Sequence, residues 1–203
     1  MAEAESALGI SSTYLFLIRS ENYNMLSYDN LEKTLKISGM GHSVGLHFSI
    51  GEHGSYDNEV QLRTLILNDA ILFRGITGLE CKVFSFHNPA DGDVFQIEVP
   101  GLVNVYNDTF FSKIKYISDS NMQWRDGCPC EMFSAGRYEQ IQMLVHPMSY
   151  ADELASDRDV LLFFLKKKLL YLKKMNEIQN RYLRDNVIGL DEIFDYIGRA
   201  ENR

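Results

Sequence analysis

The sequence predicts an α/β fold with a parallel sheet, either open or closed into a barrel. Apolar runs rich in β-branched and aromatic residues alternate with segments of helical spacing. Residues 12–18 are apolar or β-branched nearly throughout, which is typical of a strand buried on both faces of a parallel sheet. Three such runs also end in a histidine, and the carboxyl ends of parallel strands share one edge of a sheet.

The first half of the chain gives the clearest alternation of strands and helices. Each predicted helix is bounded by capping residues or glycine, and each strand by polar residues. Strand, helix, strand order implies right-handed crossovers and parallel pairing. The predicted elements are a helix at 2–8, strands at 12–18, 42–47 and 82–86, a helix at 31–37, and a long helix between the cap Asp57 and Gly75.

The second half is less regular until the chain becomes helical. Between residues 88 and 124 only 114–117 reads as a clear strand. A short helix at 131–138, a strand at 140–145, a long helix capped by Asp157 and a short helix from Gly189 to 197 follow. We therefore expect an α/β domain at 1–150 and a helical extension at 151–203 packed on it.

Composition and charge exclude several functional classes. A net charge of −8 argues against nucleic acid as a partner, since such binding needs a clustered basic face. The lysines at 166–168 and 173–174 are interpreted as one solvated helix face. No apolar run is long enough to span a bilayer and no secretory signal is visible, so we expect no stable membrane insertion and a cytoplasmic location.

Other common catalytic motifs are absent from the sequence. There is no Gly-x-Gly-x-x-Gly after a strand, no Walker loop and no Gly-x-Ser-x-Gly elbow. Cys81, Cys128 and Cys130 are an odd number of cysteines, which favours reduced thiols. A soft-metal or redox site built on Cys128 and Cys130 is the competing interpretation.

Histidines at strand ends are the main candidates for chemistry. His47, His87 and His146 each follow an apolar run, where imidazoles from different strands can meet around a metal or a substrate. His42 begins its strand and is interpreted as structural, whereas His53 could fold back as a further ligand. For each of these histidines taken alone, an ordinary core or loop role remains the alternative.

A polar loop after the strand at 114–117 is a candidate sugar site. Asp119, Trp124 and Arg125 combine a carboxylate, an indole and a guanidinium, which suit the hydroxyls and the apolar face of a sugar ring. A turn stabilised by the Asp119 side chain, with Trp124 anchored in the core, is the equally open alternative.

These motifs, in this order, resemble the polysaccharide deacetylase superfamily, and within it the shorter bacterial proteins of surface-polysaccharide biosynthesis. The resemblance covers about residues 1–150. It rests on Leu-Gly-Ile-Ser-Ser-Thr-Tyr-Leu-Phe at 8–16, Tyr-Asn at 23–24, Gly-His-Ser-Val-Gly-Leu-His at 41–47, Ser-Phe-His-Asn-Pro at 85–89, Tyr-Ile-Ser-Asp-Ser with Trp-Arg at 116–125, and Leu-Val-His-Pro at 144–147.

The resemblance implies an irregular (β/α) barrel that removes acetyl groups from N-acetylated sugars with the help of a divalent metal, commonly zinc. His47 would then be a metal ligand, His87 a metal ligand or part of the active-site wall, and His146 the general acid. The implied substrate is an N-acetylated sugar or a sugar-linked precursor, and a homo-oligomer is left open.

The sequence departs from the family at its first strand. That strand carries His-Asp-Val-Asp in this subgroup, whereas residues 1–5 look like the helix that follows it. Gly51 also stands where a second histidine would follow His47 by four residues. We therefore expect an incomplete barrel, either an N-terminally shortened de-N-acetylase or a non-catalytic carbohydrate-binding relative.

Overall fold

The computed structural model describes residues 1–88, 96–150 and 156–179, and residues 181, 185, 189, 191–193 and 195. The chain divides into two compact units, Met1–Val145 and His146–Arg203. The first unit holds all the strands of the described part of the chain.

A parallel four-stranded sheet organises the first unit. Strands β1 (Thr13–Phe16), β2 (Ser43–Phe48), β3 (Val83–Phe86) and β4 (Val103–Asn104) lie in the order β1-β2-β3-β4. Every neighbouring pair is parallel. The expectation of a mixed α/β fold with a parallel sheet is thereby confirmed.

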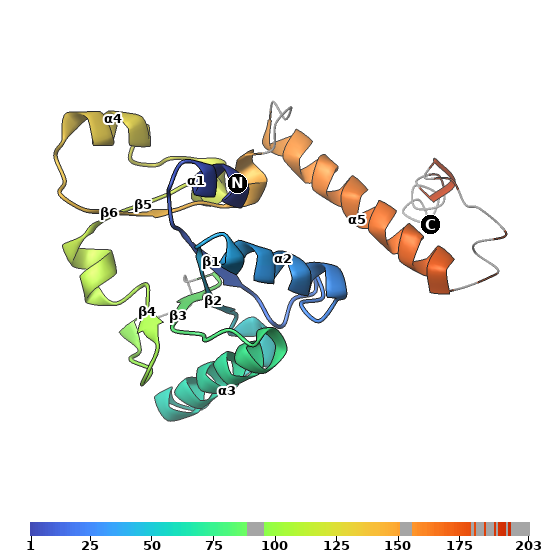
Figure 1. The fold of residues 1–203 in the computed structure, drawn as a ribbon, viewed down its shortest axis with the longest axis horizontal. Coiled ribbons are helices and arrows are strands. Elements are labelled where there is room, and N and C mark those ends of the chain that lie inside the picture. The colour runs from blue at the N-terminus through green and yellow to red at the C-terminus, as the bar shows by residue number, and fades with distance from the viewer. Residues whose placement is uncertain are drawn as a thin grey trace. The chain divides into compact units, whose positions relative to one another are not determined.

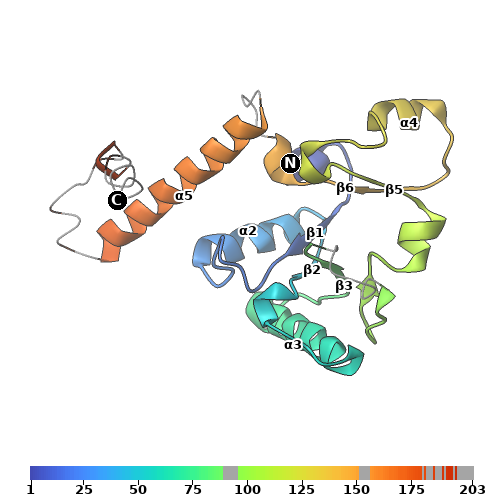
Figure 2. The same ribbon diagram turned by 180° about the vertical axis from the view of Figure 1, so that it is seen from behind.

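Helices α2 (Tyr28–Gly39) and α3 (Glu59–Thr77) connect the first three strands. Both cover the same face of the sheet, since Val44 packs with Phe73 of α3 and with Ile37 of α2. The ribbon views show these two helices beside the four-stranded sheet (Figures 1 and 2). The short helix α1 (Ala2–Ala7) precedes β1, as predicted from residues 2–8.

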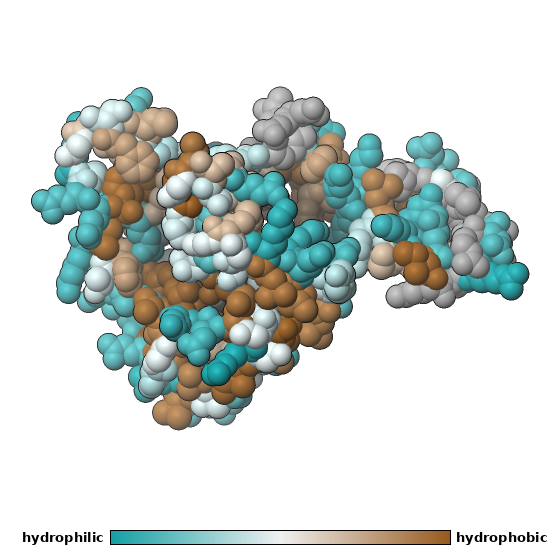
Figure 3. Space-filling view, in the orientation of Figure 1, coloured by the Kyte–Doolittle hydropathy of each residue, from teal (hydrophilic) through white to brown (hydrophobic). Residues whose placement is uncertain are grey.

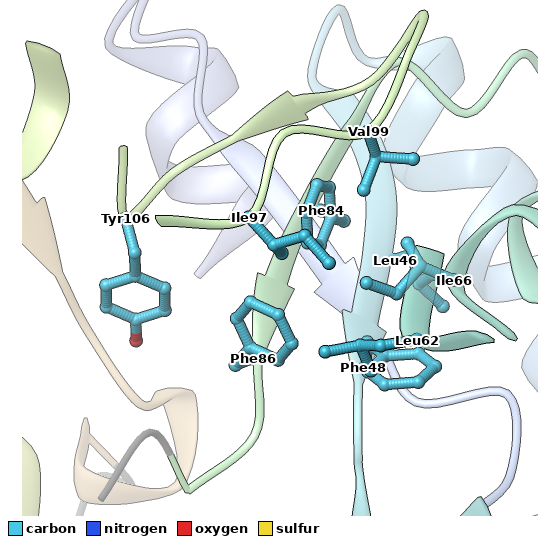
Figure 4. Close-up of a cluster of buried hydrophobic side chains, with 9 residues drawn as sticks. All are labelled: Leu46, Phe48, Leu62, Ile66, Phe84, Phe86, Ile97, Val99 and Tyr106. Atoms are coloured by element: carbon cyan, nitrogen blue, oxygen red, sulfur yellow. The ribbon is translucent and has the colours of Figure 1, made fainter. Parts of the chain in front are cut away.

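The main core lies between this sheet and α3. Strand alternation sends Leu46 and Phe48 toward the helix, where they meet Leu62 and Ile66, and these four side chains are fully buried. Phe84 and Phe86 enter the same cluster from β3. Figure 4 shows the nine residues of this cluster: Leu46, Phe48, Leu62, Ile66, Phe84, Phe86, Ile97, Val99 and Tyr106.

The ends of α3 differ from the prediction by one and three residues. Asn58, rather than Asp57, is the N-cap, and its side chain accepts a hydrogen bond from the Gln61 amide at 3.0 Å. The helix continues through Gly75 and ends at Gly78, whose φ of 71° is left-handed. Glycine adopts that conformation without steric cost, which makes Gly78 the better helix end.

The outer faces of α2 and α3 carry some apolar side chains among polar ones. Leu35 of α2, and Val60, Ile71 and Leu72 of α3, are exposed. The space-filling view shows apolar and polar surface mixed over this part of the unit (Figure 3). Isolated exposed apolar residues are ordinary on folded proteins, so this surface identifies no binding site.

A second sheet completes the first unit. Strands β5 (Lys115–Ser118) and β6 (Ile141–Leu144) pair in parallel, close to the positions predicted for them. The π-helix η3 (Thr109–Lys113) and the 3-10 helix η4 (Ser120–Met122) flank β5, and α4 (Pro129–Ala135) precedes β6. Within the described ranges the six strands thus form two sheets, of four and two strands.

The second unit is helical. The 3-10 helix η5 (Pro147–Tyr150) is followed by α5 (Asp157–Gln179). The amide of Asp159 donates to Ser156 Oγ at 3.2 Å, so Ser156, rather than Asp157, caps this helix. The predicted last helix lies partly outside the described residues. No helix in the described part of the chain is long and apolar enough to cross a membrane.

Candidate functional site

Strands β2 and β3 place His47 and His87 at the carboxyl edge of the sheet. In β2 the neighbours of His47 on either side are buried against α3, so its side chain points to the opposite face. The register pairs His47 with Ser85 of β3. His87 follows β3 directly, and its amide donates to the Phe48 carbonyl at 2.7 Å, which extends the parallel pairing by one step.

These three residues form a continuous chain of polar contacts. His47 Nδ1 lies 2.6 Å from Ser85 Oγ, and His47 Nε2 lies 3.2 Å from His87 Nδ1. The two rings are nearly perpendicular, with centroids 5.1 Å apart. Ser85 is 2% exposed, whereas both imidazoles are partly exposed. The structure thus brings together the two histidines that the sequence proposes as metal ligands.

The 3.2 Å between His47 Nε2 and His87 Nδ1 is a hydrogen-bond distance between two imidazoles, and it is also close to the spacing of neighbouring ligands on one metal ion. Zinc binds imidazole nitrogen at about 2.0–2.1 Å, so two ligands in a tetrahedral site lie about 3.3 Å apart. The observed separation of 3.2 Å agrees with this value. His47 also contacts an oxygen through its other nitrogen, as metal-bound histidines usually do. The distance between His47 and His87 would therefore accommodate two ligands of a zinc site, and their role as metal ligands stays a prediction.

A third ligand is not found in the described ranges. No three side chains of His, Cys, Asp or Glu cluster there closely enough to hold a metal ion. Catalytic zinc sites commonly use three protein ligands and a water. The described residues therefore supply two of the ligands that such a site requires.

His53 belongs to a separate polar network around Asp69. His53 Nε2 donates to Asp69 Oδ2 at 2.8 Å, and Arg19 Nε donates to Asp69 Oδ1 at 3.3 Å. The His53 ring stacks on Phe48 at a centroid distance of 4.8 Å. This network lies on the α3 side of the sheet, opposite His47. His53 is therefore hydrogen-bonded to Asp69 on that face and does not lie with His47 and His87.

Sequence reasoning did not single out Asp69, although a signal was present. Asp69 occupies a core-facing position of α3 and is 3% exposed, between the buried residues Ile66 and Phe73. A carboxylate in the apolar stripe of a helix requires buried partners. That position could have led to Arg19 and His53, which supply those partners from the chain after β1 and β2.

His42 has the structural role that the sequence suggests. Its Nδ1 accepts a hydrogen bond from the Ser12 amide at 3.1 Å, and its Nε2 lies 2.9 Å from the Ala2 carbonyl oxygen. The Tyr14 ring packs edge-on against the imidazole. These contacts join α1 to the amino ends of β1 and β2, away from the edge that carries His47.

The predicted sugar-binding residues follow β5. Asp119 is 2% exposed, and its amide donates to the Leu144 carbonyl at 3.3 Å. Burial raises the pKa of the Tyr116 hydroxyl, hydrogen bonds with Ser118 and Tyr106 oppose this effect, and the charges of Asp119 and Arg125 act in opposite directions. Arg125 is exposed and Trp124 is partly buried. Asp119 and Arg125 thus both act on Tyr116, and a sugar-binding role for the loop remains a prediction.

His146 lies in the second unit, apart from the unit that carries His47 and His87. Its side chain is exposed, and its carbonyl accepts a hydrogen bond from the Ser149 amide at 2.9 Å. Its assignment as a general acid therefore stays a prediction.

The cysteines form no disulfide. Cys81 is partly buried, and Cys128 and Cys130 are exposed. Burial raises the pKa of the Cys81 thiol, and a hydrogen bond with Cys128 raises that of Cys130. The soft-metal or redox interpretation of Cys128 and Cys130 therefore stays a prediction.

Comparison of the sequence with models of protein families gives no match. Comparisons with curated proteins and with solved structures also give none.

Proposed function

We propose that this protein is a metal-dependent carbohydrate de-N-acetylase with an irregular (β/α) barrel of the polysaccharide deacetylase type. The observation that carries the proposal is the 3.2 Å approach of His47 Nε2 and His87 Nδ1 at the carboxyl edge of a parallel sheet. In such folds, ligands and substrates bind at this edge. The residues motivate the metal site, and the family resemblance supplies the sugar substrate.

In this proposal His47 and His87 hold a divalent metal, zinc first among the candidates. When bound, such a metal polarises a carbonyl and lowers the pKa of a water. Asp119, Trp124 and Arg125 bind the sugar, and His146 protonates the departing amine. The substrate is an N-acetylated sugar or a sugar-linked precursor. Free thiols at all three cysteines are consistent with a cytoplasmic location, which the proposal includes.

Zinc binding by the purified protein tests the metal site. The wild-type protein is expected to bind zinc, measured by competition with a chromophoric chelator. His47→Ala is expected to remove zinc binding while circular dichroism stays unchanged. The double variant Cys128→Ser, Cys130→Ser is the matched control and should bind zinc like the wild type. Unchanged zinc affinity in His47→Ala would exclude the proposed site.

Acetate release from N-acetylated sugars tests the reaction. The zinc-loaded protein should release acetate, and a chelator should stop the release. His146→Ala should lower the rate by about 100- to 10,000-fold, the usual contribution of a general acid. A rate in His146→Ala equal to that of the wild type would remove His146 from the proposed reaction.

A non-catalytic carbohydrate-binding relative is the second candidate. It is favoured by the presence of only two clustered ligands, His47 and His87, among the described residues. This candidate predicts that N-acetylated sugars quench Trp124 fluorescence without any release of acetate. Measurable acetate release would decide against it.

A further inference from the structure

We infer that Ser85 is a positioning residue, which selects the ring nitrogen that His47 presents to a metal. The inference rests on the proposed function, because it concerns the same site. Ser85 Oγ lies 2.6 Å from His47 Nδ1, and the two residues are register partners on neighbouring strands. The parallel ladder itself therefore holds the hydroxyl against the imidazole.

The direction of the hydrogen bonds follows from what a metal requires. The facing nitrogens, His47 Nε2 and His87 Nδ1, must both be unprotonated to act as ligands. The remaining proton of a neutral His47 ring is then on Nδ1. In the metal-bound state the Ser85 hydroxyl must therefore accept a hydrogen bond from His47 Nδ1–H. In the absence of a metal, the other tautomer of His47 would let the hydroxyl donate instead.

Burial makes this acceptor hard to replace. Ser85 is 2% exposed, and its hydroxyl is the oxygen that meets Nδ1 from the neighbouring strand. With Ser85→Ala, the Nδ1–H would lose this acceptor, which penalises the tautomer that binds metal. Removal of such an orienting partner typically costs 10- to 100-fold in metal affinity.

Zinc affinity in three variants tests the inference. Ser85→Ala is expected to raise the zinc dissociation constant by about 10- to 100-fold. Ser85→Thr keeps the hydroxyl and a strand-favouring shape, and should restore affinity to within a few-fold of the wild type. Ser43→Ala is the matched control, because Ser43 lies on the same strand face as His47 but is exposed.

A second measurement separates positioning from a general effect on the fold. In the zinc-loaded wild type, proton NMR should show the His47 Nδ1–H as a resonance that exchanges slowly with water. Ser85→Ala should lose this resonance while its circular dichroism and its unfolding midpoint without zinc stay close to those of the wild type. If Ser85→Ala instead unfolds, Ser85→Thr alone decides through the same resonance and the zinc affinity.

The outcomes distinguish this inference from the proposal beneath it. Wild-type zinc affinity in Ser85→Ala, combined with loss of binding in His47→Ala, would overturn the inference and leave the metal site intact. Wild-type affinity in His47→Ala would overturn both. Weak binding in Ser85→Thr as well as in Ser85→Ala would show that packing, rather than the hydroxyl, controls affinity, and would also overturn the inference.

Discussion

Two histidine networks lie at the carboxyl end of β2, on opposite faces of the sheet, and they differ in how the imidazole is engaged. His53 binds a buried carboxylate that Arg19 also contacts. His47 meets a hydroxyl and a second imidazole. In the first arrangement the buried Asp69 carboxylate is hydrogen-bonded by both His53 and Arg19, which suits a structural role. The second leaves two imidazoles facing each other, which suits a bound cation.

The largest expected effect tests the structural half of this comparison. Asp69→Ala removes the buried acceptor shared by His53 and Arg19, so we expect the free energy of unfolding to fall by about 2–4 kcal/mol. Zinc affinity should stay that of the wild type, because the His47 pair lies on the other face. Urea unfolding and chelator competition measure the two quantities.

Asp57→Asn is the control for that variant, because Asp57 is exposed and only its backbone amide is hydrogen-bonded, to Gln61. It should change neither stability nor zinc affinity. A marked loss of zinc binding in Asp69→Ala, with the fold retained, would contradict the separation of the two networks.

A smaller effect is expected where β2 and β3 approach each other closely. A Cβ on Gly45 would lie 2.5 Å from the Val83 carbonyl oxygen and 2.6 Å from Val83 Cγ1. Gly45→Ala should therefore cost about 1–3 kcal/mol of stability. It should also weaken zinc binding, since the two strands that carry His47 and His87 must move apart.

Gly75→Ala is the matched control for Gly45→Ala. Its added Cβ meets nothing within 4 Å in the exposed part of α3, so we expect a gain of about 0.5–1 kcal/mol instead of a loss. Urea unfolding of both variants measures the contrast. Equal stability changes in the two variants would contradict the close approach at Gly45.

The smallest effect concerns stability at alkaline pH, and it depends on two tyrosines outside both histidine networks. Burial raises the pKa of both Tyr106 and Tyr116 above the ordinary value of about 10. Between the unfolded and folded pKa values the folded state binds more protons, so stability is intact below pH about 10 and declines above it. Each tyrosine contributes at most about 1.4 kcal/mol per pH unit.

Thermal unfolding between pH 8 and 11 measures this decline. Tyr106→Phe should make the decline shallower than in the wild type, because one group with a raised pKa is removed. His47→Ala and Asp69→Ala should retain the wild-type slope even though their absolute stabilities differ. A decline that is as steep in Tyr106→Phe as in the wild type would assign the effect to other groups.

Local sequence patterns predicted every described strand except β4, because the other strands are apolar runs bounded by polar residues. The Asp69 network was not predicted, because its partners lie 16 and 50 residues away in sequence. The predicted ends of α3 were wrong by one and three residues. Asn58 caps the helix instead of Asp57 because its side chain accepts a hydrogen bond from the Gln61 amide. The helix ends at Gly78 instead of Gly75 because Gly78 adopts a left-handed φ.

The predicted meeting of His146 with the other histidines depends on how the two units are arranged, which no local pattern encodes. The same holds for closure of a barrel, since β5 and β6 pair with each other in the described ranges. Strand positions were predictable from short segments. Contacts between distant segments were not.

The alternation of β2 has a consequence for insertions and deletions. Because side chains alternate along the strand, Phe48 is buried against α3 and His47 lies on the opposite face. The register of β2 therefore determines both the core packing and the position of His47. Deleting one residue between Ser43 and Leu46 would exchange the two faces, exposing phenylalanine where imidazole belongs. The deletion of a single codon would then disrupt both the hydrophobic core and the His47–His87 pair.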